Sequence, residues 1–135
     1  MEEATCGNTG SLTVNYTVSD ACGNSTIVPA VFLIQDTQAP VFTDTPEDVT
    51  FQCDGLGNMG EIGTWIGSNG NALVTDACSD VTVTNNFVAL TGGCDGSGNT
   101  GEAFVTFTAT DECGLSSTAM AVSYTHLTLP TTPYV

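Results

Sequence analysis

The sequence predicts an all-β protein built as an antiparallel β-sandwich with one short helix. Two observations predict it. Stretches such as 12–17 and 103–108 alternate apolar with polar residues, which is the period-two pattern of half-buried strands. Fifteen Gly and five Pro, among many Asn and Thr, separate these stretches by frequent turns. Short strands at this spacing favour two packed sheets.

An internal repeat of 91 residues organises the chain. The motif Gly-Asn-Thr-Gly at 7–10 recurs at 98–101, and the stretch LTVNYTVSDACG aligns without a gap with AFVTFTATDECG. The chain therefore holds about one and a third copies of the repeat. We expect residues 1–36 to be the C-terminal strand hairpin of a truncated preceding repeat. Residues 37–122 would be one complete repeat, and 123–135 a tail.

Individual elements follow from local patterns. Strands are expected at 49–52, 72–75, 81–84, 87–90, 103–110 and 118–122. Glu61 to Asn69 is the one helical candidate, because Ile62 and Trp65 fall on one face. Residues 37–40 form a linker, since Pro40 lacks the amide hydrogen that a central strand needs.

The charge balance excludes several functions. The chain has no Lys or Arg, 15 Asp and Glu, and a formal net charge of −15. Nucleic-acid binding, anionic-membrane binding and phosphoryl transfer therefore lack their usual cationic residues. No apolar run reaches the roughly 18 residues of a membrane span. We expect no enzyme, because a carboxylate pair such as Asp76 and Asp111 lacks an aromatic-lined cleft and no native His base remains.

The C-terminal stretch contains the single histidine and does not look native. Residues 122–132 read VSYTHLTLPTT, which resembles one reading frame of a transposon-end adapter used in preparing sequencing libraries. We therefore interpret residues 123–135 as a non-biological tail of a metagenomic fragment. His126, the single histidine, belongs to this tail.

Several motifs together resemble a known family. They are Asp36-Thr37-Gln38-Ala39-Pro40, Thr75-Asp76-Ala77-Cys78, the strand ending in Thr110-Asp111-Glu112-Cys113-Gly114, and the helix that carries Trp65. Over residues 6–121 the chain resembles the hyalin-repeat type of immunoglobulin-like module, which occurs in tandem in large bacterial surface and adhesion proteins. The resemblance implies tandem immunoglobulin-like β-sandwiches that are secreted or exposed on the cell surface. It also implies a binding or spacer role, with neighbouring repeats of the same chain and an unknown surface protein or glycan as partners.

The six cysteines argue for disulfides, because the chain has no C-x2-C pair and no native histidine to suggest zinc. In an immunoglobulin-like strand order, Cys53 and Cys94 lie at one end of the sandwich and Cys78 and Cys113 at the other. We therefore expect the pairs Cys53–Cys94 and Cys78–Cys113.

Two cysteines remain outside this scheme. Cys6 and Cys22 take the places of Cys94 and Cys113 in the truncated copy, whose other cysteines are missing. We expect both to be left unpaired or to be forced into a non-native pair. Disulfides throughout also indicate an extracellular or cell-surface location.

The same strand order brings acidic side chains together. Asp76 and Asp80 lie in one loop, Asp111 ends a strand at the same end of the module, and Asp36 lies in the linker that enters there. A calcium ion is bound by six to eight oxygen atoms, several of them carboxylate. We therefore expect Asp36, Asp76, Asp80 and Asp111 to form a calcium site. The alternative is that these aspartates cap turns and keep the surface soluble.

The sequence thus predicts a structural or adhesive repeat module of a large secreted or cell-surface protein, stabilised by calcium and disulfides. A first alternative is a subunit of an extracellular filament, because the hairpin at 10–35 has strand edges that a second chain could pair with. A second is an accessory carbohydrate-binding module of a secreted enzyme, for which no residue stands out.

Overall fold

The computed structural model describes residues 6–92 and 100–126. The described strands are β1 (Gly10–Ser19), β2 (Ser25–Ile34), β3 (Val41–Asp44), β4 (Val49–Gln52), β5 (Leu73–Thr75), β6 (Val81–Asn85), β7 (Thr91–Gly92), β8 (Gly101–Asp111) and β9 (Ser116–His126). A single α-helix, α1 (Met59–Gly67), is followed by a 3-10 turn, η1 (Asn69–Asn71). The all-β class with one short helix is therefore confirmed.

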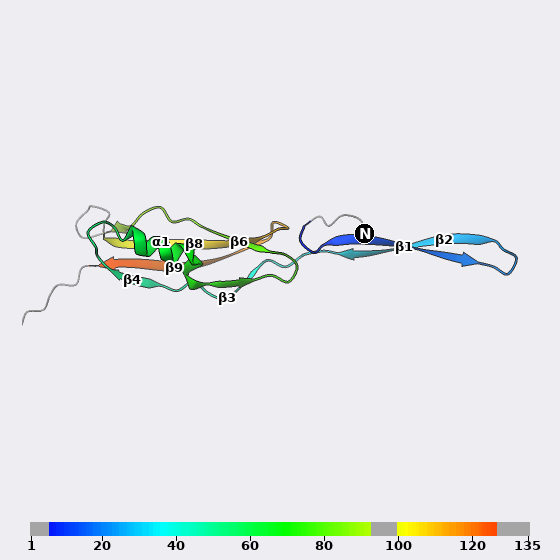
Figure 1. Ribbon diagram of the computed structural model, residues 1–135, viewed down its shortest axis with the longest axis horizontal. Helices are drawn as coiled ribbons and strands as arrows, with labels where there is room; N and C mark the ends of the chain where they lie inside the picture. Colours follow the sequence, from blue (N-terminus) through cyan, green and yellow to red (C-terminus); the bar gives the residue numbers. More distant parts are fainter. Residues whose placement is uncertain (1–5, 93–99, 127–135) are drawn as a thin grey trace, which may run out of the picture.

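The strands form three sheets. Five strands make the main sheet in the order β4-β9-β8-β6, with β7 also paired to β8. The facing layer is small and consists of the two-stranded sheet β3–β5 together with α1. The hairpin β1–β2 extends away from this sandwich along the long axis of the molecule (Figure 1). One pairing differs from the expected antiparallel arrangement, because β4 runs parallel to β9.

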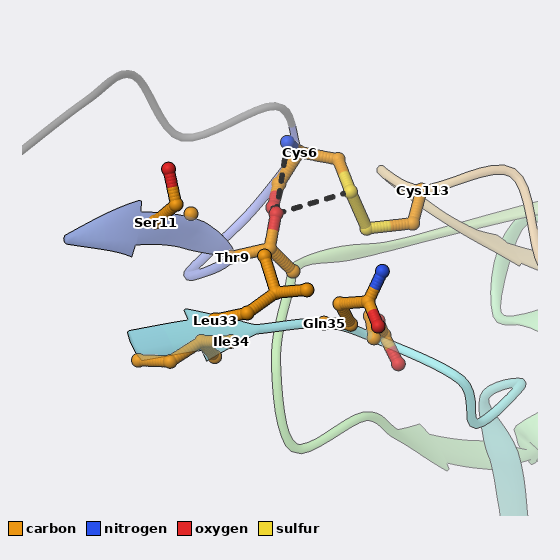
Figure 2. A pocket seen from close by; sticks show the side chains of 9 residues that line it. Cys6, Thr9, Ser11, Leu33, Ile34, Gln35 and Cys113 are labelled. Atoms are coloured by element: carbon orange, nitrogen blue, oxygen red, sulfur yellow. Dashed lines mark hydrogen bonds between the residues drawn. A yellow bond between two sulfur atoms is a disulfide. The ribbon is translucent and has the colours of Figure 1, made fainter. Parts of the chain in front are cut away.

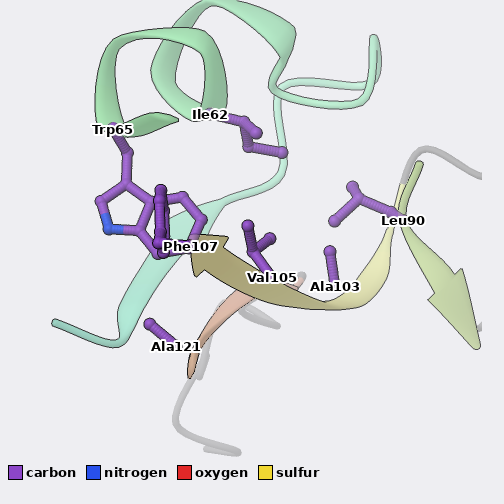
Figure 3. Packing of buried hydrophobic residues seen from close by; sticks show 7 residues of the cluster. All are labelled: Ile62, Trp65, Leu90, Ala103, Val105, Phe107 and Ala121. Carbon is purple, nitrogen blue, oxygen red and sulfur yellow. The ribbon is translucent and has the colours of Figure 1, made fainter. Parts of the chain in front are cut away.

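The core lies between α1 and the main sheet, where the alternating pattern of β8 places every second side chain (Figure 3). Trp65 of α1 meets Phe107 of β8 edge to face, with ring centroids 5.6 Å apart. The Trp65 indole N–H donates to the carbonyl of Glu47 at 3.0 Å, so its polar atom is satisfied inside the core. The helix is thus anchored through one aromatic residue.

Most expected elements shift by one or two residues at an end, and the helix expected at 61–69 spans Met59–Gly67. Two strand expectations need larger corrections. Residues 87–90 do not form a strand; Phe87 packs against the core and Leu90 is buried within it, so packing explains their apolar character. Strand β9 extends to His126, past the expected boundary at residue 122. Residues 123–126 pair with β4, from Val49 opposite Ser123 onward. The adapter origin of residues 123–135 stays a prediction.

The two hairpins β1–β2 and β8–β9 are copies of one structure. Gly10 pairs with Ile34, and Gly101 pairs with Thr125, each 91 positions further along the chain. The register of every described pair between these limits is therefore the same in both hairpins. Because a slip by one residue would exchange the two faces of a strand, this shared register supports the repeat expected from the sequence.

The hairpins differ in what covers them. The β8 positions Ala103, Val105, Phe107 and Ala109 are at most 5 % exposed. The corresponding β1 residues Leu12, Tyr16 and Val18 are 44 %, 54 % and 56 % exposed. Within the described residues, β1 and β2 pair only with each other, so this hairpin has no helix or neighbouring strands over its apolar face. The apolar face of this hairpin is therefore uncovered within the described structure. Its assignment to a truncated preceding repeat stays a prediction.

The end of β9 carries two buried hydroxyl groups without partners. Ser123 is 0 % and Thr125 4 % exposed, and neither hydroxyl has a hydrogen-bond partner in the described structure. The matching β2 positions are the apolar residues Phe32 and Ile34. A buried polar group left without a partner costs free energy, so these two positions weaken the sheet.

We expect Ser123→Ala and Thr125→Val to raise the free energy of unfolding by about 1 kcal/mol each, because each change removes an unpaired hydroxyl with little change in volume. Thr118→Val, at an exposed position on the same strand, is the matched control and should change it much less. Urea unfolding of the oxidised protein measures all three. A loss of stability in Thr125→Val would show that its hydroxyl is satisfied.

Candidate junction and cation site

A disulfide joins the hairpin β1–β2 to the sandwich. Cys6, four residues before β1, bonds to Cys113 in the turn between β8 and β9, with a Cα–Cα distance of 5.0 Å (Figure 2). The expected pair Cys78–Cys113 is therefore wrong. Of the two outcomes expected for Cys6, the unpaired thiol is also wrong, since Cys6 is bonded to Cys113. Cys78 does lie at the same end of the module but forms no disulfide among the described residues. The expected pairs joined loops within one module, whereas the observed disulfide joins the hairpin to the neighbouring module.

The other expected pair lies partly outside the described residues. Cys94 is not among them, so Cys53–Cys94 stays a prediction. Cys53 is half-buried, and its amide donates to the carbonyl of His126 at 2.9 Å, beside the end of β9. Cys22 is exposed at the tip of the hairpin and forms no disulfide among the described residues.

The first Gly-Asn-Thr-Gly motif makes the backbone contact across the junction. The Asn8 amide donates to the carbonyl of Cys78 at 2.8 Å. Gly7 has φ +51°, and a Cβ atom there would lie 2.4 Å from the Cβ of Ser79. Only glycine fits this close approach with that backbone conformation. The motif defines the repeat in the sequence, and its first glycine, Gly7, is the signal that could have indicated a close backbone contact.

Two of the four expected calcium ligands meet beside the disulfide. Ligand atoms of Asp36, Asp111 and Cys113 all lie within 4.8 Å of one another. Asp111 is 6 % exposed; its Oδ1 accepts the amide of Leu115 at 2.8 Å, and its Oδ2 is buried without a partner in the described structure. Asp36 repeats this arrangement, with Oδ1 accepting the Gln38 amide at 3.1 Å and Oδ2 buried and unpaired within the same part of the chain.

The other two aspartates lie apart from this pair. Asp76 Oδ1 accepts the amides of Cys78 at 2.8 Å and Ser79 at 3.0 Å, so this carboxylate caps a turn. Asp80 is exposed. Among the described residues, neither belongs to the group formed around Asp111. The expected cluster of four carboxylates is therefore reduced to Asp36 and Asp111, and the turn-capping alternative holds for Asp76.

The electrostatic environment of this pair is negative. Since the sequence contains no Lys or Arg, no such side chain can neutralise the two carboxylates. Burial, and then the charges of Asp36, Asp76 and Asp111, raise the pKa of the nearby Cys78 thiol. A buried carboxylate oxygen without a donor is costly unless a cation approaches it.

One member of the pair, Asp36, lines a cleft beside the disulfide. A cleft of about 370 Å³ lies between the base of the hairpin and the disulfide, and Asp36, Cys6 and Cys113 are among its lining residues (Figure 2). Such a cleft has room for a cation and for water molecules that complete its coordination. The sulfur of Cys113 is bonded to Cys6 and so does not act as a thiolate ligand. The arrangement can therefore hold a hard cation on oxygen atoms.

Comparison with known proteins identifies one similar relative. No protein-family model matches the chain. The chain is 33 % identical over 130 residues to Hyalin from Strongylocentrotus purpuratus, an alignment that covers 92 % of this chain and 10 % of that protein. The chain thus spans about a tenth of the length of its relative. This similarity supports a hyalin-like module. Among the described residues, no helix has the length and apolar character to cross a membrane.

We expect Gly7→Ala to open the junction, because the new methyl group would collide with Ser79 at a backbone conformation that already disfavours a side chain. Gly23→Ala is the matched control, since Gly23 also has positive φ (+87°) but a Cβ there meets no atom within 4 Å. Hydrogen exchange of the Asn8 amide should accelerate at least tenfold in Gly7→Ala and stay unchanged in Gly23→Ala. Equal protection in the two variants would contradict the close contact.

Proposed function

We propose that the chain is a structural and adhesive repeat module of a large secreted or cell-surface protein, and that it acts without enzymatic activity. The observation that carries this proposal is the Cys6–Cys113 bond, which ties the hairpin of one repeat to the turn of the next. A module used as a spacer must transmit distance and force through such junctions. Neighbouring repeats are accordingly its first partners, and any surface protein or glycan ligand would bind the outer surface of the array.

Four contacts limit bending at this junction. Besides the disulfide, the Asn8 amide is bonded to Cys78 and Gly7 packs on Ser79. On the other side of the linker, the Ser117 hydroxyl donates to the carbonyl of Pro40. Because the segment before β1 is held by the disulfide and the Asn8 contact, and the linker after β2 is held at Pro40, the hairpin and the sandwich are kept end to end (Figure 1). This is the behaviour expected of a stiff spacer.

An extracellular location follows from the same features. Disulfides persist in oxidising compartments, and the bond between Cys6 and Cys113 is part of the junction rather than of a catalytic site. The similarity to Hyalin covers most of the chain and supports the same type of module. The bacterial origin implied by the family resemblance remains a further proposal.

Calcium is the proposed cofactor, and its ligands are Asp36 and Asp111. The two buried, unpaired Oδ2 atoms supply negative oxygen ligands on either side of the junction, one from the linker and one from the β8–β9 turn. Backbone carbonyls and water in the adjoining cleft would complete an irregular shell, which calcium accepts more readily than magnesium does. Binding would then lock the linker onto the module.

We expect calcium to raise the Tm of the oxidised chain and a chelator to reverse the rise. At one hundred times Kd, a ligand that binds only the folded state contributes about 2.7 kcal/mol, which corresponds to roughly 10 °C for a domain of this size. Asp36→Asn and Asp111→Asn should each abolish most of the shift, since each keeps its Oδ1 as an amide acceptor while removing the charge.

Asp80→Asn is the matched control, because it removes an exposed acidic group outside the pair. It should retain the full calcium shift. The absence of any shift in the unmodified chain at millimolar calcium, or an equal loss in Asp80→Asn, would contradict the proposed site. Calorimetry in calcium-containing and calcium-free buffer gives both readings.

A filament subunit is the second candidate function. It is favoured by the hairpin β1–β2, whose outer edges pair with no other strand among the described residues and whose apolar side chains are exposed. A strand from a second chain could complete this sheet. Polymers that persist after reduction of all disulfides would support strand complementation. The accessory carbohydrate-binding role stays a prediction without a nominated residue.

A further inference from the structure

We propose that Cys22 is one half of a second junction disulfide, whose other half is a cysteine directly before a Gly-Asn-Thr-Gly strand of a neighbouring module. The inference rests on the proposed role as a tandem module and names the contact that would join the hairpin β1–β2 to the module preceding it. Its basis is that Cys22 stands where Cys113 stands in the other hairpin, and Cys113 is bonded to such a cysteine.

The turns that carry the two cysteines have the same geometry. In each turn the aspartate Oδ1 accepts the backbone amide four residues later. The distance is 2.9 Å from Asn24 to Asp20 and 2.8 Å from Leu115 to Asp111. The glycines that follow Cys22 and Cys113 have φ values of +87° and +86°. In both turns this glycine donates its amide to the carbonyl of the aspartate at 3.2 Å. The backbone therefore presents Cys22 as it presents Cys113.

The surroundings of Cys22 are open. Its side chain is exposed, and a Cβ atom added at the adjacent Gly23 would meet no atom within 4 Å. The turn is held by hydrogen bonds to Asp20 from the amides of Cys22 and Asn24 and from the Asn24 side chain, and the Asn24 bonds are the main cause of the lowered pKa of Asp20. A rigid turn with an accessible thiol can bond to a partner without rearranging its own backbone.

The partner segment is known from the first junction. Cys6 directly precedes the Gly-Asn-Thr-Gly motif at 7–10, and Gly7 of this motif packs against Ser79. In the sequence, the 91-residue offset between the two Gly-Asn-Thr-Gly motifs aligns Cys6 with Ser97, rather than with Cys94 as the order of the cysteines suggested. Thr100 of the second motif is 3 % exposed, as its counterpart Thr9 is 6 % exposed, so the described part of this motif repeats the first.

The direction of the contact is head to tail. The β1–β2 turn lies at one extreme of the molecule, and the ends of β4 and β9 lie at the other (Figure 1). A bond between the turn of one module and the base of the next is a heterologous contact, which adds modules in a line and does not close. In a pure sample of this chain, the base of a second copy has Ser97 where the partner cysteine would stand, so the unmodified chain does not supply the partner thiol there.

The bond forms by thiol–disulfide exchange with a small-molecule disulfide as oxidant. The first thiolate attacks the oxidant and releases one thiol, which leaves a mixed disulfide. The second protein thiolate displaces the remaining half as a second thiol. Two S–H bonds are lost, one protein S–S bond is formed, and the oxidant is reduced by two electrons.

The test supplies the missing half in the full chain. Ser97→Cys places a cysteine directly before the second motif, and it is chosen from its sequence position. In a buffer of oxidised and reduced glutathione, this variant should form a ladder of covalent oligomers on non-reducing gels. Peptide mapping should find Cys22 of one copy joined to the introduced cysteine of another. Adding Cys22→Ser should reduce the ladder at least tenfold.

Two controls decide the interpretation. Thr82→Cys introduces a thiol at an exposed position on β6 and should give no comparable ladder. Adding Cys78→Ser to Ser97→Cys should leave the ladder intact. A ladder that persists without Cys22, dimers linked only through two Cys22 residues, or no oligomers at all would overturn the inference. The calcium melting experiment does not depend on these outcomes. Absence of the Ser97→Cys ladder would therefore overturn the second disulfide, and the calcium-dependent Tm would still test the proposed module independently.

Discussion

The bond between Cys6 and Cys113 is the constraint on which the rest of the arrangement depends. It closes a loop across a sequence separation of 107 residues, for which the chain-entropy model gives a contribution of about 4–5 kcal/mol. It also holds the base of the hairpin against the loop that carries Cys78, so that the Asn8 amide finds its acceptor. The hairpin has little core of its own, so its position is fixed by the disulfide and the Asn8 contact at its base.

A second constraint is the absence of any Lys or Arg. Carboxylates must then be satisfied by backbone amides, and the turns show this: Asp20, Asp54 and Asp76 each accept two amides within four residues. Asp36 and Asp111 use one oxygen in the same way and bury the other without a partner in the described structure. These two groups lie at the junction, where a cation would relieve both at once.

Local pattern was sufficient for most of the fold. The alternation in 103–110, the helical face of Ile62 and Trp65, and the 91-residue offset predicted β8, α1 and the shared hairpin register. The strand predicted at 87–90 is wrong because the apolar residues of this segment pack into the core from an irregular backbone. The parallel pairing of β4 with β9 joins segments far apart in the chain, and strand periodicity carries no information about the direction of such pairs.

The site was only partly predictable, for a related reason. Placing Cys78 and Cys113 at one end of the module was sound, since Ser79 Oγ accepts the Glu112 amide there at 3.3 Å. The choice of partner depended on a segment from the preceding repeat, which a strand order within one module does not include. Likewise, the aspartates of one loop could have been ligands or turn caps, and only the hydrogen bonds of Asp76 distinguish these roles.

The most direct test of the junction is peptide mapping of the oxidised chain without reduction, after thiols have been blocked at low pH to prevent exchange. The structure predicts a cross-linked peptide pair that joins Cys6 to Cys113, with Cys78 recovered as a blocked thiol. A cross-link between Cys78 and Cys113, with Cys6 recovered as the thiol, would contradict it, because the hairpin would then be joined to the module only through the linker after β2.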